Sequence, residues 1–183
     1  MTNYEKYKQL LLRNNYKLDD THAYMVYSRR SEVNIHVTEK VIRVKNKDQY
    51  NDYMEVLSSA FGGEISADNP YAGSINDEYY QAIKDSLNNN DIYHYVLYKD
   101  DEPACVATLS TANKTGSINN VGTLKGYQNK GLGKQIMSYM ISEFEKLGGK
   151  ELFLFTEHNS KNEQWYERQS FKTIAIIEQY VKE

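Results

Sequence analysis

Residues 120–134 read Asn120-Val-Gly-Thr-Leu-Lys-Gly-Tyr-Gln-Asn-Lys-Gly-Leu-Gly-Lys134. Hydrophobicity of period two before the loop predicts a strand over residues 117–123, and a 3.6-residue apolar stripe predicts a helix over residues 131–147. A helix start presents unpaired backbone N–H groups and the positive end of its dipole, so it attracts anions. The stretch therefore predicts a strand, a polar loop and a helix arranged to bind phosphate.

The composition of the loop supports a phosphate site. Gly131 and Gly133 have no side chain to block a phosphate that approaches the backbone. Lys130 and Lys134 add positive charge to this part of a chain whose net charge is −3. An ordinary glycine-rich helix start remains the structural alternative.

Two common nucleotide-binding patterns do not fit this loop. A P-loop needs a lysine and a hydroxyl residue after its second glycine, but Gly131 is followed by Leu132. A Rossmann fingerprint needs a third glycine where the chain has Ile136. Residues 128–133, Gln-Asn-Lys-Gly-Leu-Gly, match the pattern [QR]-x-x-G-x-[GA]. This pattern resembles the acetyl-CoA pyrophosphate loop of the GNAT superfamily of N-acetyltransferases.

The resemblance covers residues 48–180 and implies an acetyl-CoA site. In that family the strand before the loop splays from its neighbour, and the pantetheine arm pairs with its backbone. The residues expected to contact acetyl-CoA are Val121, Gly122, Thr123, Gln128, Asn129, Lys130, Gly131, Leu132, Gly133, Lys134 and Asn159. Acetyl-CoA is thus the expected co-substrate.

A second motif of the family follows after one strand. Asn159, Tyr166 and Phe171 stand at the family spacing, with Trp165 in the usual bulky position. By resemblance, Tyr166 is the acid that protonates the leaving thiolate, and a phenol with a pKa of about 10 is protonated at neutral pH. By the same resemblance, the N–H of Val121 stabilises the oxyanion that forms when an amine attacks the thioester. These two residues are the expected catalytic groups.

The chain also departs from the family pattern. Lys125 replaces a common proline and Ser170 replaces a usual glycine, while Gln128 keeps hydrogen bonding without charge. Some members carry a glutamate base on the strand before the loop, but the matching residue here is Ser117. A glutamate base at that position is therefore excluded. The remaining candidates for the proton acceptor are Glu64, Asp68, Asp77 and Glu78.

Hydrophobic periodicity along the whole chain predicts an α+β fold. The expected helices span residues 3–14, 48–61, 77–87, 131–147 and 159–169, and the expected strands span residues 22–28, 33–37, 40–45, 92–98, 104–111, 117–123, 152–155 and 172–181. Short strands joined by turns favour antiparallel pairing. We expect a GNAT-like mixed, mostly antiparallel sheet flanked by helices. Residues 1–183 are expected to form one domain, with residues 1–40 as an N-terminal extension packed at one sheet edge.

Composition excludes several other classes. No apolar stretch approaches the about 20 residues that span a bilayer, and the start lacks the apolar core of a signal peptide. The single cysteine, Cys105, permits no internal disulfide, and no His, Cys, Asp or Glu cluster has metal-ligand spacing. We therefore expect a cytoplasmic protein without metal or membrane partner. Cys105 and His94 are expected to be packed residues, and His158 a loop residue without an assigned role.

The charge distribution bears on the partner. Residues 48–100 hold 2 basic and 10 acidic side chains, whereas residues 1–47 hold 10 basic and 5 acidic ones. No concentrated basic face points to nucleic acid. The acidic segment favours a small cationic amine as acceptor, although a solvated face would have the same composition. The alternatives are a protein N-terminus or lysine as acceptor, and a non-catalytic acyl-CoA-binding sensor; a monomer or a homodimer fits equally.

Overall fold

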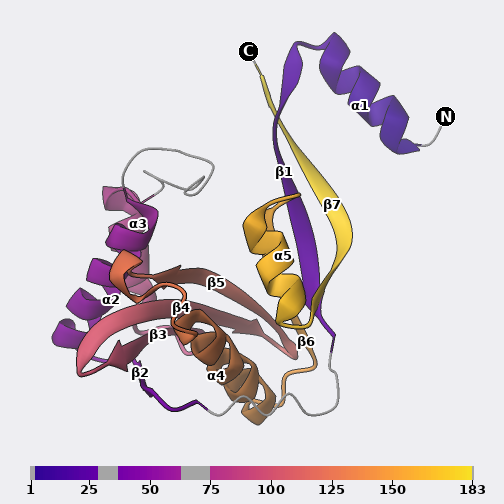
Figure 1. Cartoon of the computed structure of the whole chain (residues 1–183). Coiled ribbons are helices and arrows are strands. Elements are labelled where there is room, and N and C mark those ends of the chain that lie inside the picture. Colours follow the sequence, from indigo (N-terminus) through magenta and orange to yellow (C-terminus); the bar gives the residue numbers. More distant parts are fainter. Residues whose placement is uncertain (1–2, 29–36, 63–74, 183) are drawn as a thin grey trace. The chain divides into compact units, whose positions relative to one another are not determined.

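The computed structural model describes residues 3–28, 37–62 and 75–182. The chain divides into two compact units, one formed by residues 30–152 and the other by residues 1–29 together with 153–183. Each unit has its own antiparallel strands and its own helices (Figure 1).

The larger unit is built on four strands in the order β2, β3, β4, β5. These are β2 (Lys40–Arg43), β3 (Ile92–Lys99), β4 (Glu102–Ala112) and β5 (Thr115–Thr123). Each adjacent pair in this order is antiparallel. Six consecutive β4 residues, 104–109, are buried, so both faces of this strand are covered. A strand covered on both faces carries apolar residues without alternation, as this one does apart from Thr108.

Helices cover both faces of these strands. α2 (Lys47–Phe61) and α3 (Asp77–Ser86) bury Tyr53, Leu57 and Ile83 in a core cluster with Val96 and Val106 of the strands. α4 (Leu132–Lys146) packs on β4 and β5, and its Tyr139 ring meets that of Tyr95, the β3 neighbour of Val96. Because adjacent strand residues point to opposite faces, α4 lies on the face opposite α2 and α3.

Local capping explains where two of these helices begin. The side chain of Asn46 accepts a hydrogen bond from the N–H of Gln49, and that of Asn76 accepts one from the N–H of Tyr79. Each asparagine satisfies one of the first N–H groups of its helix. The predicted helices over residues 48–61 and 77–87 are confirmed to within one residue at each end.

The smaller unit places the N-terminal extension in the middle of its sheet. β1 (Tyr16–Tyr27) pairs antiparallel with β6 (Glu151–Glu157) on one side and with β7 (Phe171–Lys182) on the other. The expectation that the extension lies at a sheet edge is therefore wrong for this strand. Ala23 and Met25 of β1 are fully buried, so this strand contributes side chains to the core.

Two helices complete the smaller unit. α1 (Asn3–Arg13) buries no residue, and its Lys8 pairs with Glu178 of β7 at 3.0 Å. α5 (Lys161–Arg168) begins after Ser160, whose side chain accepts a hydrogen bond from the N–H of Glu163. None of the helices in residues 3–28, 37–62 and 75–182 is both long and apolar enough to cross a membrane.

The predicted α+β class is confirmed, with antiparallel strands flanked by helices. Two details differ. Phe155, in the predicted strand over residues 152–155, is 49% exposed, because burial alternates along β6 and its two neighbours Leu154 and Thr156 are the buried ones. The Phe155 ring centre lies 5.1 Å from that of Tyr24. Leu147, expected in the apolar stripe of α4, is 51% exposed just after the helix end. The predicted strand over residues 33–37 lies almost wholly outside the described residues.

Candidate functional site

Strand β5 carries an extra residue beside Val121. The register between β4 and β5 shifts between Val106 and Thr108, so that β5 contributes both Asn120 and Val121 where β4 contributes a single residue. Asn120 has a φ of 56°, in the left-handed region. This arrangement is a β-bulge, which disrupts the ladder and leaves the extra residue unpaired. A bulge of this kind also increases the local twist of the strand.

The next two residues lead from the bulge into the loop. Gly122 is buried beneath the end of α2, where Ala60 lies close to its Cα hydrogens. The hydroxyl of Thr123 lies 3.1 Å from the sulfur of Cys105. Burial raises the pKa of Cys105 to about 12, so its thiol stays protonated and acts as a small core group, as predicted.

The loop is fastened to the end of β5 by one of its own side chains. After a turn of 3₁₀ helix at Lys125–Tyr127, Gln128 Nε2 donates a hydrogen bond of 3.2 Å to the carbonyl of Thr123. The Lys130 ammonium lies 5.1 Å from the ring centre of Tyr127. Asn129, which lies between Gln128 and Lys130 in the sequence, has a φ of 59°. The Gln128 side chain therefore ties the loop to the end of β5, and the charge of Lys130 stays exposed on the loop.

Helix α4 starts without a capping side chain. Gly131 occupies the N-cap position with a φ of 81°, and no described side chain caps this end. The first backbone bond of the helix runs from the N–H of Gln135 to the carbonyl of Gly131 at 3.1 Å. The N–H groups of Leu132, Gly133 and Lys134 precede this bond and have no partner within the helix. The side chain of Leu132 is only 2% exposed, so only its backbone can face a ligand.

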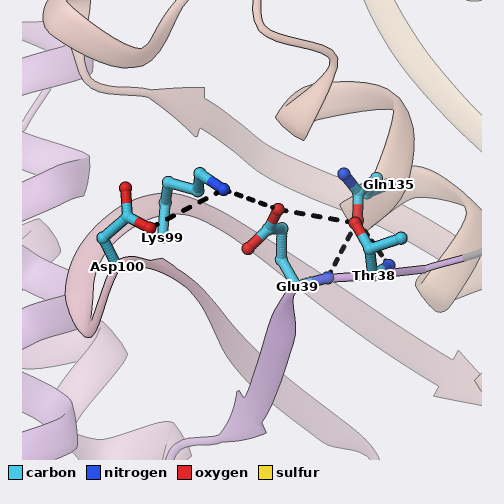
Figure 2. A network of polar contacts seen from close by, with 5 residues as sticks. All are labelled: Thr38, Glu39, Lys99, Asp100 and Gln135. Carbon is cyan, nitrogen blue, oxygen red and sulfur yellow. Dashed lines mark hydrogen bonds and ion pairs between the residues drawn. The ribbon is translucent and has the colours of Figure 1, made fainter.

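A polar network holds the first turn of α4 in place (Figure 2). Gln135 Oε1 accepts hydrogen bonds from the N–H of Thr38 at 2.8 Å and the N–H of Glu39 at 3.1 Å. The Glu39 carboxylate pairs in turn with the Lys99 ammonium at 3.1 Å, and Lys99 lies 3.8 Å from Asp100. The start of α4 is thereby tied to the residues before β2 and to the turn after β3.

Asn159 and Tyr166 belong to the smaller unit. Asn159 is exposed with a φ of 61°, and its N–H donates to Glu163 Oε2 at 2.6 Å. Tyr166 is half-buried on α5, with its ring centre 4.9 Å from that of Trp165 and 6.2 Å from that of Phe171. The motif residues Tyr166 and Phe171 are therefore packed together.

The buried carboxylate of Glu163 organises the segment around Asn159. Burial alone would raise the pKa of Glu163, but hydrogen bonds from Thr173 Oγ1 and the Asn159 N–H, with the nearby His158 ring, lower it. The His158 Nδ1 lies 3.1 Å from Glu163 Oε2. His158, to which the sequence assigned no role, thus helps to fix the turn that presents Asn159.

Of the predicted acetyl-CoA residues, those from Val121 to Lys134 lie in the larger unit, with Gly122 and Leu132 buried, whereas Asn159 lies in the smaller unit. Of the proposed proton acceptors, Asp77 and Glu78 lie exposed on the first turn of α3. Glu64 and Asp68 lie outside the described residues. Within the described residues, no group of three His, Cys, Asp or Glu side chains could hold a metal ion.

A buried polar group next to the bulge was not predicted from the sequence. The side chain of Asn120 forms hydrogen bonds with the hydroxyls of Tyr79 and Tyr53, and the Tyr53 hydroxyl is also hydrogen-bonded to Thr108. Thr108 also contacts His94, which is 3% exposed, so the prediction that this histidine is packed is confirmed. The sequence pattern gave only a weak indication of this network, namely polar residues within otherwise apolar strands.

Solved structures of low identity share this fold. A functionally unknown conserved protein from Staphylococcus epidermidis superposes with a TM-score of 0.68 at 19% identity, over 96% of this chain and 65% of that one. The ribosomal-protein-S18-alanine N-acetyltransferase of Escherichia coli gives 0.58 at 15% identity, over 74% of this chain and 78% of that one. Glucosamine-6-phosphate N-acetyltransferase from Arabidopsis thaliana gives 0.54 at 16% identity, over 75% and 94%.

The chain spans 65% of the length of the Staphylococcus epidermidis structure, and identities of this size establish only a shared fold. The family is shown by comparison of sequences. No curated protein sequence matches the chain significantly. A profile of the acetyltransferase (GNAT) family matches residues 53–171, which include β5, the loop, α4 and α5. This match covers more than half of the sequence, and the chain therefore belongs to the acetyltransferase (GNAT) family.

Proposed function

We propose that this chain transfers an acetyl group from acetyl-CoA to a primary amine by direct attack of the amine on the thioester. The observation that carries the proposal is the uncapped start of α4 at Gly131, which follows the bulged strand β5 after the loop of residues 124–130. Membership of an acetyltransferase family supports it. The single-domain organisation expected from the sequence is part of the same proposal.

The N–H groups at the start of α4 would bind the pyrophosphate of acetyl-CoA. A Cβ atom at Gly131 would meet no atom within 4 Å, so there is open space in front of the backbone. Lys130 and Lys134 are exposed beside this space and supply positive charge. A helix start of this kind suits a phosphate group because its N–H groups and its dipole act together.

The chemistry then needs alignment more than activation, because a thioester is already reactive. The nitrogen of the neutral amine bonds to the thioester carbon, and the N–H of Val121 donates to the developing oxyanion. The C–S bond breaks, and the thiolate takes the phenolic proton of Tyr166. Tyr166 regains a proton from solvent. The amine proton leaves through water, with Asp77 and Glu78 as candidate acceptors.

The acceptor is proposed to be a small cationic molecule, since residues 48–100 hold 10 acidic and only 2 basic side chains. Two of the solved structures with this fold are, by their names, acetyltransferases of a ribosomal-protein alanine and of glucosamine-6-phosphate. A protein N-terminus or lysine is therefore the alternative acceptor. A non-catalytic acyl-CoA sensor is the alternative of another class, motivated by Ser117 in place of a glutamate base and by Ser170 in place of a usual glycine.

The test is thiol release from acetyl-CoA with a panel of polyamines, amino sugars and peptides. We expect one amine class to give turnover, and Tyr166→Phe to lower kcat by about 100-fold, as loss of a general acid does. Tyr7→Phe, at a residue that is 69% exposed on α1, is the matched control and should change nothing. Binding of CoA without thiol release from any amine would favour the sensor.

A binding test separates the family site from the chemistry. CoA should raise the melting temperature of the wild-type chain, and Gly131→Glu should abolish that shift by placing a carboxylate before the phosphate. If CoA gives no shift, and Gly131→Glu behaves as the wild type, the proposed site is wrong.

A further inference from the structure

The backbone of Asn120 sets the position of Val121, and this backbone is unusual for the strand. Its φ of 56° lies in the left-handed region, which costs most residues energy but is more accessible to asparagine. The bulge therefore needs something that holds Asn120 in this conformation.

The side chain of Asn120 is held from both ends. The Tyr79 hydroxyl donates a hydrogen bond of 2.6 Å to Asn120 Oδ1. Asn120 Nδ2 donates to the Tyr53 hydroxyl oxygen at 3.2 Å, and Thr108 Oγ1 lies 3.4 Å from the same nitrogen. Tyr53 is fully buried, so one anchor is part of the core. An amide bonded at both its oxygen and its nitrogen has a single favoured orientation.

The hydrogen bonds continue through the core in one consistent direction. Ser86 Oγ donates to the carbonyl of Ile83 at 2.7 Å, so His94 Nε2 must donate to Ser86 Oγ across 2.7 Å. His94 Nδ1 then accepts from Thr108 Oγ1 at 2.8 Å. Tyr53 is left to donate to Thr108 Oγ1 at 2.7 Å.

With a neutral His94, every side-chain N–H and O–H donor of this network has an acceptor. This series of hydrogen bonds begins at the Tyr79 hydroxyl and ends at the Ser86 hydroxyl, and both residues lie on α3. No buried side-chain nitrogen or oxygen in the described residues lacks a hydrogen-bond partner. Satisfied buried networks of this kind fix geometry, because any rearrangement leaves a polar group unpaired.

We infer that Asn120 is a positioning residue that holds the β5 bulge, and through it the N–H of Val121, with Tyr79 as the clamp that fixes its amide. The inference rests on the proposed function for its catalytic consequence. Asn120 acts through the backbone of the next residue. Tyr79 connects helix α3 to the strand that would face the thioester.

The most specific test removes one hydroxyl group. Tyr79→Phe loses the hydrogen bond to Asn120 Oδ1, and we expect kcat for thiol release to fall about 10-fold while KM for acetyl-CoA stays unchanged. Tyr80→Phe is the matched control on the same helix, since the Tyr80 hydroxyl bonds to Ser58 and not to the network. Its kcat should equal that of the wild type.

Substitutions at Asn120 separate conformation from anchoring. Asn120→Ala disfavours the left-handed conformation and loses both anchors, so kcat should fall about 100-fold, the loss that a misplaced or missing oxyanion donor produces. Asn120→Gly permits the conformation without the anchors and should lie between Asn120→Ala and the wild type. If Asn120→Ala does not fold, Tyr79→Phe still decides the matter.

A spectroscopic readout keeps this inference distinct from the proposed function. In ¹H–¹⁵N spectra of the chain without substrate, Tyr79→Phe should shift the Val121 amide signal, whereas Tyr80→Phe should not. Wild-type protein that releases no thiol would refute the proposed function while this readout still tests the clamp. Unchanged kcat and an unmoved Val121 signal in Tyr79→Phe would overturn the inference.

Discussion

A Cβ atom placed on Gly122 would lie 2.8 Å from the Cβ of Ala60, closer than such atoms approach in proteins. The end of α2 therefore packs directly on the β5 backbone, one residue after Val121. The ring of Phe61 lies 3.3 Å from the same point and Val106 lies 3.6 Å from it, so the helix has no free direction in which to yield. A glycine at this position is required by packing.

Gly122→Ala should therefore destabilise the larger unit. Overpacking of this kind costs about 1–3 kcal/mol, because Ala60 belongs to the helix and cannot rotate away. Urea unfolding followed by circular dichroism measures the change. Gly126→Ala is the matched control, since a Cβ there meets nothing within 4 Å. Equal stability of the two variants would contradict the packing argument.

Gly131→Ala isolates backbone strain from steric contact. The φ of 81° is unfavourable for alanine, but its Cβ would touch no other atom within 4 Å. We expect a loss of about 1–2 kcal/mol in unfolding free energy, the usual cost of a left-handed residue, and weaker CoA binding. Gly131→Asn should lose less, because asparagine adopts this conformation more readily. An alanine variant as stable as the wild type would show that the backbone at 131 is not constrained.

Gln128 offers a test of loop closure. Gln128→Ala removes the 3.2 Å bond to the carbonyl of Thr123 at an exposed position, so unfolding should change by less than about 1 kcal/mol. CoA binding should nevertheless weaken several-fold, because the loop loses its tie to β5 and must be ordered on binding. Calorimetric titration with CoA measures this. Gln81→Ala, also exposed but on α3, should bind CoA like the wild type.

The sequence was sufficient for those parts of the fold that depend on local patterns. The apolar stripe of α4 is confirmed from Leu132 to Phe144, because the 3.6-residue period and the observed burial agree over more than three turns. The glycine-bearing loop begins where the motif predicts. Only the position of Leu147 fails, since a stripe does not reveal where the neighbouring core ends.

Features that depend on distant pairing could not be predicted from the sequence. The period-two pattern identified part of β1, but it does not say that β6 and β7 lie on its two sides. The hydrogen-bond network around Asn120 could not be predicted for a related reason. Its tyrosines, Tyr53 and Tyr79, are two of 17, and only the packing of α2 and α3 on β5 distinguishes them from the rest.

The same network makes stability depend on pH through His94. Burial lowers the pKa of His94 to about 4, and the positive charge of Arg43 acts in the same direction. In the unfolded chain the histidine pKa is about 6.5. Between these values the unfolded chain binds a proton that the folded chain does not, so unfolding becomes more favourable as the pH falls from about 6.5 to about 4.

Above about pH 7 the contribution of His94 is constant, and below about pH 4 it changes no further. Across this interval His94 alone should lower the unfolding free energy by up to about 3 kcal/mol. His94→Gln provides the comparison, because its amide can donate to Ser86 and accept from Thr108 but does not titrate in this range. Urea unfolding of both proteins at pH 7.5, 6.0 and 5.0 isolates the histidine, since all other titrating groups are shared. The wild type should lose stability faster than His94→Gln as the pH falls, and parallel curves would mean that His94 accepts a proton in the folded core.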